Sequence, residues 1–512
     1  MRKNLVEEFD RCWRDHPTKT AVIDQSGSIT FEQLARKSMA LAGIITKDLH
    51  GRRNTPVAVL LPKCANVVVS DLAISYSCNI FMNLDIHLPE ARLQNILALI
   101  KPAMILTNNQ MAETANRFGI SVVSLDTAEL DAIQIDKIHE GLMESLCNQI
   151  DTDPYCIINT SGSTGTPKGV VLNHRSFFDF YDWSLETFHF DGSEMIGSLS
   201  PVVFDIYDYE LCLLMMKGST MVLLEASLGI FPARLLETLA EYKINFIFWV
   251  PTIMVNIANL NLLEKIDVSC LKTIWFAGEV FPTKQFNYWR RSLKNTTFAN
   301  LYGPIEITLD CTYYIAENQL PDDEALPIGY PCRNTDVLLL NDQDQFCAVD
   351  EIGELCVRGT SLAMGYYNNQ EKTAAAFVQN PLNCAYPELI YRTGDLAYRD
   401  HEGKFIFKGR KDNLIKHMGY RIELGEIEHI AVNTLKLVPN CCVVYNRTKK
   451  AITMIYEKSE TAADITLKKA LGQQLPRYMV PTDYVQLEIL PRNATGKIDR
   501  LKLTQMVNQC QG

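Results

Sequence analysis

Short apolar runs bounded by turn residues recur up to residue 301 of this 512-residue chain. Val57–Leu61 lies between two prolines, and Phe246–Val250 is another such run, while residues 64–80 have a helical pattern. Runs that are apolar on both faces are typical of parallel strands covered by helices on both sides. Their alternation with helical stretches predicts a doubly wound α/β fold. Further strand-like runs are 104–107, 121–125, 155–159, 220–224, 273–277 and 297–301, and a hairpin is expected over 21–31.

The overall composition limits the classes of protein to be considered. A chain of 512 residues exceeds one hydrophobic core, so two or more domains are expected. The net charge of -11 argues against a general nucleic-acid binder. The first residues carry charges where a signal peptide needs an apolar core, and no apolar run reaches the roughly 18 residues that span a bilayer, so we expect a cytoplasmic protein without a membrane segment. The 15 cysteines include no C-x-x-C pair, which predicts reduced thiols and no zinc site.

The texture of the sequence changes near residue 327. Glycines, prolines and short alternating strands such as Glu354–Arg358 and Lys404–Lys408 predict a β-rich subdomain over 327–408. The polar segment Gly409–Asn413 is expected to be a turn and a hinge. The last hundred residues predict a small, mobile α+β domain. The expected organisation is therefore a large N-terminal domain of doubly wound sheets over 1–408 and a small C-terminal lid domain over 409–512.

A loop of small residues, Thr160–Gly169, follows one of the expected strands. Such a loop can present backbone N–H groups and hydroxyls to phosphate oxygens, and Lys168 adds a mobile positive charge. Lys168 does not follow a glycine at the Walker A spacing, so the sequence predicts a phosphate-binding loop of a different kind. A flexible surface loop is the alternative that composition alone allows.

Six motifs follow one another along the chain, and together they resemble the adenylate-forming superfamily. Within it they are most similar to the amino-acid adenylation domains of non-ribosomal peptide synthetases, over nearly the whole chain from Ile29 to Lys497. The resemblance implies attack of a carboxylate on the α-phosphate of ATP, with ATP and Mg²⁺ as cofactors and no protein nucleophile. Such catalysis depends on holding two anions in line and neutralising developing charge. The motifs are 160–169, 300–306, 391–395, 409–412, 419–428 and 493–499.

The resemblance assigns nucleotide roles to individual residues. Glu306 would hold Mg²⁺, which suits a carboxylate together with substrate oxygens. Asp395, assisted by Arg410, would hold the ribose hydroxyls, and Tyr302 would stack on adenine. Lys497 would bridge the substrate carboxylate and the α-phosphate or ribose, so Lys497 and Glu306 are the expected catalytic residues. The full implied set for ATP and AMP is Thr160, Ser161, Gly162, Ser163, Thr164, Gly165, Lys168, Gly278, Asn300, Tyr302, Asp395, Phe407 and Arg410.

Each of these residues also has a purely structural interpretation. Asp395 could be a turn residue, Glu306 a solvated carboxylate at a helix start, and Tyr302 a core residue. Lys497 could be a surface charge on a polar loop. The shared order of the motifs favours the functional interpretation.

The acid pocket is implied in the same way. Asp205 stands where the family pairs an aspartate with the substrate α-ammonium, which argues for an amino acid because a buried carboxylate needs a cationic partner; a helix N-cap is the alternative. Asp310 does not fit an apolar pocket: facing inwards it predicts a second polar or basic group on the substrate, and facing outwards a surface charge. Asp208 is expected to be solvated. The implied lining is Asp205, Ile206, Tyr209, Phe248, Trp275, Ala277, Leu301, Leu309 and Asp310.

The bulky, apolar residues of that lining predict a small cavity. Two segments, 276–282 and 300–304, are similar to prolyl–carrier-protein ligases and partly to D-alanine–carrier-protein ligases. Proline is therefore the substrate that the resemblance suggests first.

The second half-reaction of the family is attack by a phosphopantetheine thiol on the acyl adenylate. The resemblance implies a hinge at Asp412 and a close approach of the pantetheine arm to Gly419, whose missing side chain leaves the backbone open. Only about fifteen residues follow Lys497. We therefore expect a monomeric enzyme that acts on a separate carrier protein, with no nucleic acid or membrane as partner.

One residue departs from the family pattern. Ile305 stands where the family usually has threonine, whose hydroxyl faces the phosphate or the metal. Its loss removes a hydrogen bond of about 1 kcal/mol, or more to a charged oxygen, so reduced or compensated activity is expected. An acyl- or aryl-CoA ligase on the same fold, which Asp205 opposes, and a binding protein without efficient catalysis remain as alternatives.

Overall fold

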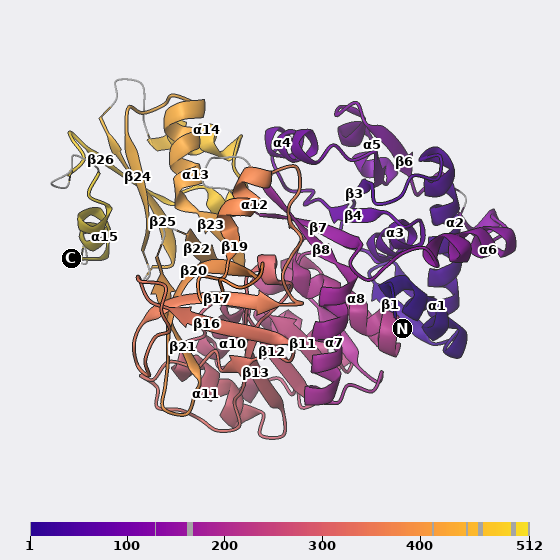
Figure 1. Cartoon of the computed structure of the whole chain (residues 1–512), viewed down its shortest axis with the longest axis horizontal. Helices are drawn as coiled ribbons and strands as arrows, with labels where there is room; N and C mark the ends of the chain where they lie inside the picture. The colour runs from indigo at the N-terminus through magenta and orange to yellow at the C-terminus, as the bar shows by residue number, and fades with distance from the viewer. Residues whose placement is uncertain are drawn as a thin grey trace. The chain divides into compact units, whose positions relative to one another are not determined.

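The computed structural model describes residues 2–128, 130–160, 167–411, 414–446, 449–458, 464–492 and 498–509. The chain divides into two compact units, and each is described by itself (Figure 1). The first unit consists of Met1–Ile86, Ile100–Ile158 and Val170–Lys411. The second consists of His87–Leu99, Asn159–Gly169 and Asp412–Gly512.

One sheet has seven strands, which are β3 (Pro56–Leu60), β4 (Ile80–Asn83), β5 (Met104–Thr107), β6 (Ser121–Ser124), β7 (Pro154–Thr160), β8 (Lys168–Asn173) and β18 (Gly365–Tyr366). Their order is β18-β8-β7-β4-β3-β5-β6. β3 pairs in parallel with β4 and β5, and β4 and β5 pair in parallel with β7 and β6. The helices between these strands are α3 (Ala65–Tyr76), α4 (Glu90–Ile100), α5 (Asn109–Asn116) and α6 (Asp136–Leu146).

A second sheet has nine strands, which are β1 (Thr20–Asp24), β2 (Gly27–Thr30), β9 (Met195–Ser198), β10 (Thr220–Leu223), β11 (Phe246–Trp249), β12 (Thr273–Phe276), β13 (Thr297–Tyr302), β14 (Thr312–Ile315) and β15 (Tyr330–Pro331). Their order is β15-β14-β13-β12-β11-β9-β10-β1-β2. The strands from β13 to β1 pair in parallel, whereas β2, β14 and β15 add antiparallel edges. The parallel sheets confirm the predicted doubly wound α/β fold. The helices of this part are α1 (Leu5–Asp15), α2 (Phe31–Asp48), α7 (His174–Phe188), α8 (Asp205–Lys217), α9 (Pro232–Glu241), α10 (Pro251–Asn259) and α11 (Thr283–Ser292).

Local sequence explains where several helices begin. Thr30 and Gln33 form a reciprocal capping box at the start of α2, which satisfies two backbone N–H groups that the helix leaves open. The Asn173 side chain accepts a hydrogen bond from the Ser176 N–H at 2.9 Å and begins α7. The sequence thus supplies its own cap at the start of α7.

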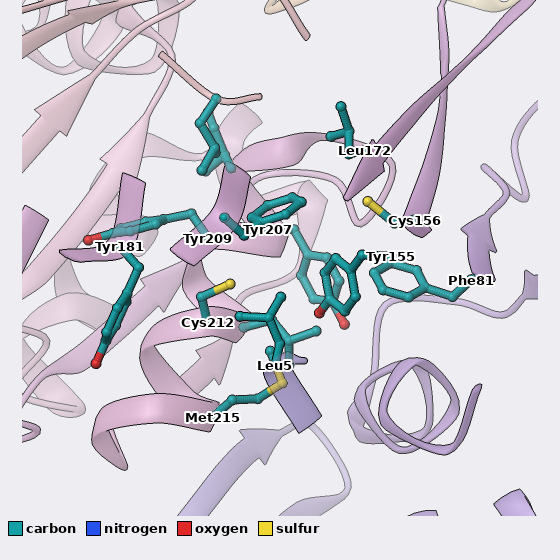
Figure 2. Packing of buried hydrophobic residues seen from close by; sticks show 14 of the residues in the cluster. Leu5, Phe81, Tyr155, Cys156, Leu172, Tyr181, Tyr207, Tyr209, Cys212 and Met215 are labelled. Carbon is teal, nitrogen blue, oxygen red and sulfur yellow. The ribbon is translucent and has the colours of Figure 1, made fainter. Parts of the chain in front are cut away.

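The core of the first unit is rich in aromatic residues (Figure 2). The rings of Phe81 and Tyr155 meet edge to face at 4.9 Å, and Tyr155 meets Phe177 in the same way at 5.2 Å. Edge-to-face contacts of this kind stabilise a core beyond the area that they bury. They join β4 and β7 of the seven-stranded sheet to α7.

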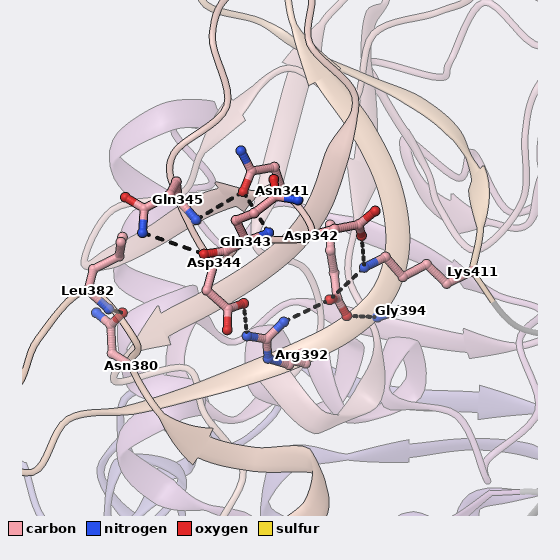
Figure 3. A network of polar contacts seen from close by, with 11 residues as sticks. Asn341, Asp342, Gln343, Asp344, Gln345, Asn380, Leu382, Arg392, Gly394 and Lys411 are labelled. Atoms are coloured by element: carbon pink, nitrogen blue, oxygen red, sulfur yellow. Dashed lines mark hydrogen bonds and ion pairs between the residues drawn. The ribbon is translucent and has the colours of Figure 1, made fainter.

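The predicted β-rich subdomain forms a five-stranded sheet of β16 (Thr335–Leu340), β17 (Gly353–Gly359), β19 (Phe377–Gln379), β20 (Leu389–Arg399) and β21 (Phe405–Arg410), with α12 (Gln370–Ala376) beside it. A network of polar contacts includes Arg392, Gly394 and Lys411 (Figure 3). All three interact with Glu354 of β17. Its carboxylate pairs with Arg392 at 3.1 Å and Lys411 at 3.4 Å, and accepts a hydrogen bond from the Gly394 N–H. Lys411 is the last residue of the first unit, and this ion pair binds it to β17.

The second unit is an α+β assembly around its own core. β22 (Leu414–His417) and β23 (Tyr420–Glu423) form a hairpin, and β24 (Cys441–Asn446), β25 (Ala451–Glu457) and β26 (Asp483–Leu487) form a sheet. Tyr420 stacks on Tyr478 with ring centroids 3.6 Å apart. The described helices of the second unit include α13 (Leu424–His429), α14 (Asp464–Gly472) and α15 (Arg500–Gln509), and all of α4 except Ile100 also belongs to this unit.

Two local features differ from what the sequence predicted, one in β21 and one in β4. Gly409 and Arg410 lie in β21 and not in a turn, because β21 pairs with β20 as far as Arg410. Strand β4 was not expected, since its four residues follow a helix directly and give no period of their own. No helix in the described part of the chain is long and apolar enough to cross a membrane.

We predict that Phe81→Ala lowers the free energy of unfolding by about 3–5 kcal/mol, because it removes a large ring from a close-packed core. The change is measured by urea unfolding followed by tryptophan fluorescence. Ile230→Ala is the control, since Ile230 is 77% exposed. Equal effects of the two substitutions would contradict the packing that we describe.

Candidate functional site

The buried carboxylate of Asp395 lies beside Tyr302, the last residue of β13. The Tyr302 hydroxyl donates to Asp395 Oδ2 at 2.5 Å, and Arg410 Nη1 donates to Asp395 Oδ1 at 2.6 Å. Burial, and then the Asp395 charge, raise the pKa of the Tyr302 hydroxyl well above its usual value, so the phenol stays protonated as a donor. Asp395 lies within β20, so it is not the turn residue of the alternative interpretation. The Phe407 ring lies 6.2 Å from that of Tyr302.

Glu306 is also buried, in a short 3-10 helix after β13. The Tyr366 hydroxyl donates to its Oε1 at 2.8 Å, and the Ala363 N–H donates to its backbone oxygen at 2.9 Å. The interpretation of Glu306 as a solvated carboxylate is therefore wrong. Tyr366 was not expected from the sequence, because a tyrosine beside a glycine has no distinctive local pattern.

The backbone that follows Glu306 has an unusual conformation. Thr308 and Leu309 have φ angles of 54° and 64°, which residues with a side chain rarely adopt. Thr308 Oγ1 is buried without a hydrogen-bond partner in the part of the chain that the structure describes. Ile305 packs partly buried against the core, where its hydrocarbon side chain offers no hydroxyl.

Asp205 is the first residue of α8, and Phe204 occupies the N-cap position. The alternative interpretation of Asp205 as the N-cap is therefore wrong. A carboxylate in the first turn interacts favourably with the positive end of the helix dipole. The rest of α8 from Ile206 to Met215 is buried.

The bulky residues expected in the acid pocket pack on one another. Tyr209 stacks on Trp275 at 5.0 Å, and Phe248 meets Trp275 edge to face at 5.4 Å. Trp275 Nε1 is buried without a hydrogen-bond partner among the described residues. The smaller members of the set are buried as well, and they are Ile206, Ala277, Leu301 and Leu309.

Two carboxylates near this cluster are more deeply buried than a surface charge. Asp310 is 4% exposed, which excludes its interpretation as a surface charge. Asp208 is 2% exposed, so the expectation that it is solvated is wrong. Burial raises the pKa of Asp208 well above its usual value, and the charge of Asp71 adds to that shift.

The phosphate-binding loop is described at its ends alone. Ser161, Gly162, Ser163, Thr164 and Gly165 lie outside the described residues, as do Asp412 and Lys497. Thr160 is buried at the end of β7, and Lys168 Nζ pairs with Glu423 at 3.0 Å within the second unit.

The remaining expected positions have specific backbone geometry. Gly278 and Gly419 have φ angles of 88° and 81°, in the region that favours glycine. The Asn300 side chain donates to the Pro327 carbonyl at 2.7 Å. No group of three or more His, Cys, Asp or Glu among the described residues could hold a metal ion. A buried carboxylate such as Glu306 nevertheless fits Mg²⁺, which takes one or two protein carboxylates together with substrate phosphates.

Comparison with known proteins identifies the class. The family model described as AMP-binding enzyme matches residues 9–367, so the chain belongs to the family of AMP-binding enzymes. Zwittermicin A synthase ZmaJ of Bacillus cereus is 31% identical over 496 residues, which are 94% of this chain and 91% of ZmaJ. Tyrocidine synthase 1 of Brevibacillus parabrevis is 28% identical over 98% of this chain but 45% of its own length. The chain thus spans nearly all of ZmaJ and less than half of the synthase.

Solved structures agree on the fold. The Vibrio cholerae adenylation domain AlmE, in complex with glycyl-adenosine-5'-phosphate, has a TM-score of 0.85 at 18% identity and covers 99% of this chain and 98% of its own. A non-ribosomal peptide synthetase protein with adenylation and PCP domains has a TM-score of 0.83 at 22% identity, over 98% of this chain and 84% of its own. The chain is therefore homologous to non-ribosomal adenylation domains, which activate an acid through AMP and work with carrier-protein domains.

We predict that Asp71→Asn changes how stability depends on pH. The Asp71 carboxylate accepts hydrogen bonds from Tyr207 of α8 at 2.8 Å and Asn83 at 3.1 Å, and burial raises its pKa to about 7. The folded protein then keeps the proton between about pH 4 and 7 while the unfolded chain loses it, so this contribution to stability is complete below about pH 4 and is lost as pH rises through 7.

The asparagine variant cannot ionise, so its stability relative to the wild type should rise from pH 4.5 to pH 8 by about 3 kcal/mol, at about 1.4 kcal/mol per pH unit below the folded pKa. Urea unfolding at both pH values measures the difference. Asp323→Asn, at an exposed aspartate, is the control. A pH-independent difference between wild type and Asp71→Asn would show that Asp71 stays ionised in the folded protein.

Proposed function

We propose that this protein activates an amino acid as its aminoacyl-AMP, releases pyrophosphate, and transfers the aminoacyl group to the phosphopantetheine thiol of a separate carrier protein. The observation that carries the proposal is the position of Asp205, half-buried at the start of the otherwise buried α8. A carboxylate there offers a fixed counter-charge to an α-ammonium group. Homology to adenylation domains supplies the reaction class.

The first step joins two anions. An oxygen of the amino-acid carboxylate forms a bond to the α-phosphorus of ATP while the bond to the bridging oxygen of the β-phosphate breaks, and pyrophosphate leaves with that electron pair. Asp395 and Arg410 are proposed to hold the ribose, and Tyr302 to contact the adenine. Mg²⁺, held by Glu306, would neutralise phosphate charge as it develops. Lys497 would contact both the carboxylate and the α-phosphate.

The second step forms a thioester. The carrier's thiol sulfur attacks the acyl carbon, the bond from that carbon to the AMP oxygen breaks, AMP leaves, and the thiol proton passes to solvent. Asp412 as a hinge and Gly419 near the pantetheine arm remain proposals for this step. The boundary between the two compact units, between Lys411 and Asp412, supports the hinge.

The substrate that these residues favour is a small amino acid. Tyr209, Phe248 and Trp275 fill the expected pocket with their own packed rings, which leaves room for few substrate atoms. The glycyl adenylate in the similar AlmE structure also supports a small substrate. Proline and D-alanine are the rival substrates.

An acyl-CoA ligase is the second candidate function. A CoA synthetase for o-succinylbenzoate shares the fold, with a TM-score of 0.81 at 20% identity over 98% of both chains. Such a substrate has no α-ammonium group for Asp205 to bind. ATP–pyrophosphate exchange measured with all twenty amino acids, D-alanine and o-succinylbenzoate separates the two functions.

We predict that Asp205→Ala abolishes amino-acid-dependent pyrophosphate exchange and that Lys497→Ala abolishes exchange altogether. Asp205 supplies the counter-charge of the substrate amine, and Lys497 the charge at the α-phosphate. Exchange is measured at saturating ATP and Mg²⁺. Asp267→Ala, at an exposed carboxylate, is the control and should exchange like the wild type. Full exchange by either variant would remove the role given to that residue.

We predict that Ile305→Thr raises the rate of exchange about tenfold, because a hydrogen bond to a charged oxygen contributes about 1.5–3 kcal/mol. Ile305→Val is the matched control, since valine has the shape of threonine without its hydroxyl. A rise with valine equal to that with threonine would assign the effect to side-chain size and not to the hydroxyl.

A further inference from the structure

Lys63 makes two short hydrogen bonds to one stretch of backbone. The residue follows β3, and its Nζ donates to the carbonyl oxygens of Ser198 and Ser200 at 2.6 Å each. Ser198 ends β9, and Ser200 lies in the segment that leads into α8. Hydrogen bonds from a charged donor are stronger than those between neutral groups. The pair therefore fixes this segment against the neighbouring sheet.

The charge of Lys63 also acts on Glu210 of α8. Glu210 is fully buried in the second turn of the helix that begins with Asp205. Burial lowers the pKa of Lys63 and raises that of Glu210, and the charge of each opposes the shift of the other. The two groups are thus electrostatic partners within one cluster.

Ser200 also extends the cluster to the expected acid pocket. Its hydroxyl donates to the Phe248 carbonyl of β11 at 3.5 Å. Asp205 follows Ser200 by five residues and precedes Glu210 by five. Lys63 therefore donates hydrogen bonds to the backbone before Asp205, and its charge also acts on Glu210 in the helix after Asp205.

We propose that Lys63 is a positioning residue that fixes the segment Ser198–Asp205 so that the Asp205 carboxylate meets the amine of the bound amino acid. The inference rests on the proposed function of Asp205. It assigns Lys63 to amino-acid binding, because the hydrogen bonds of Lys63 reach the segment before Asp205. The proposed nucleotide-binding residues Asp395 and Glu306 lie on other elements.

The test compares Lys63→Met, Lys63→Arg and the wild type in ATP–pyrophosphate exchange with the best amino acid. Methionine keeps the length of the side chain and removes the donors, so KM for the amino acid should rise about tenfold while KM for ATP changes less than about twofold. Arginine can donate to two carbonyls and should restore most of the amino-acid affinity.

Lys19→Met is the matched control. Lys19 Nζ also donates to a backbone carbonyl at 2.6 Å, that of Gly192, before the opposite end of β9. This variant loses a comparable hydrogen bond in the same sheet and should leave both KM values unchanged. A rise of both KM values in Lys63→Met, together with no recovery in Lys63→Arg, would mean that Lys63 has only a structural role and would overturn the inference.

Hydrogen–deuterium exchange of the amides in 199–205 provides a readout that does not depend on activity. Lys63→Met should accelerate this exchange, and Lys19→Met should not. Unchanged exchange would show that Lys63 does not restrain the segment, and faster exchange with an unchanged amino-acid KM would show that the restraint does not serve binding. If none of the amino acids tested supports pyrophosphate exchange by the wild type, the proposed function fails. Hydrogen–deuterium exchange still decides in that case whether Lys63 restrains the segment.

Discussion

The burial of α8 is the constraint on which the site depends. A helix buried from Ile206 to Met215 would ordinarily be apolar, yet it carries Asp208 and Glu210 and begins with Asp205. Each carboxylate removed from water needs a proton, a donor or a cation. The charge of Lys63 lowers the pKa of Glu210, whereas the charge of Asp71 adds to the rise in the pKa of Asp208. Of the three, Asp205 is the one that is half-buried and adjacent to the expected pocket.

The nucleotide end of the site uses a different arrangement of charge. Asp395 accepts one hydrogen bond on each carboxylate oxygen, from Tyr302 and Arg410, and these donors come from β13 and β21. Glu306 accepts a hydrogen bond from the hydroxyl of Tyr366, which lies on β18. Donors supplied by separate strands hold an acceptor without any motion of its own, which is the kind of preorganisation that electrostatic catalysis requires. Both carboxylates lie in the first unit.

The aromatic packing around Trp275 joins residues of separate elements. Tyr209 and Phe248 lie against its ring from α8 and β11, so a change in one of them moves the others. Enlarging the pocket would require several substitutions together. The proposed preference for a small acid therefore rests on core packing.

The sequence by itself determined the fold class, because parallel strands covered on both faces leave apolar runs. It also showed six motifs whose order resembles that of adenylation domains. Glycines such as Gly278 and Gly419 were also recognisable locally, since their backbone angles exclude most side chains. Only the tertiary structure decided the environment of each carboxylate. The burial of Asp208, the bond from Tyr366 to Glu306 and the bonds from Lys63 to Ser198 and Ser200 join residues far apart in the chain, and no local pattern encodes such contacts.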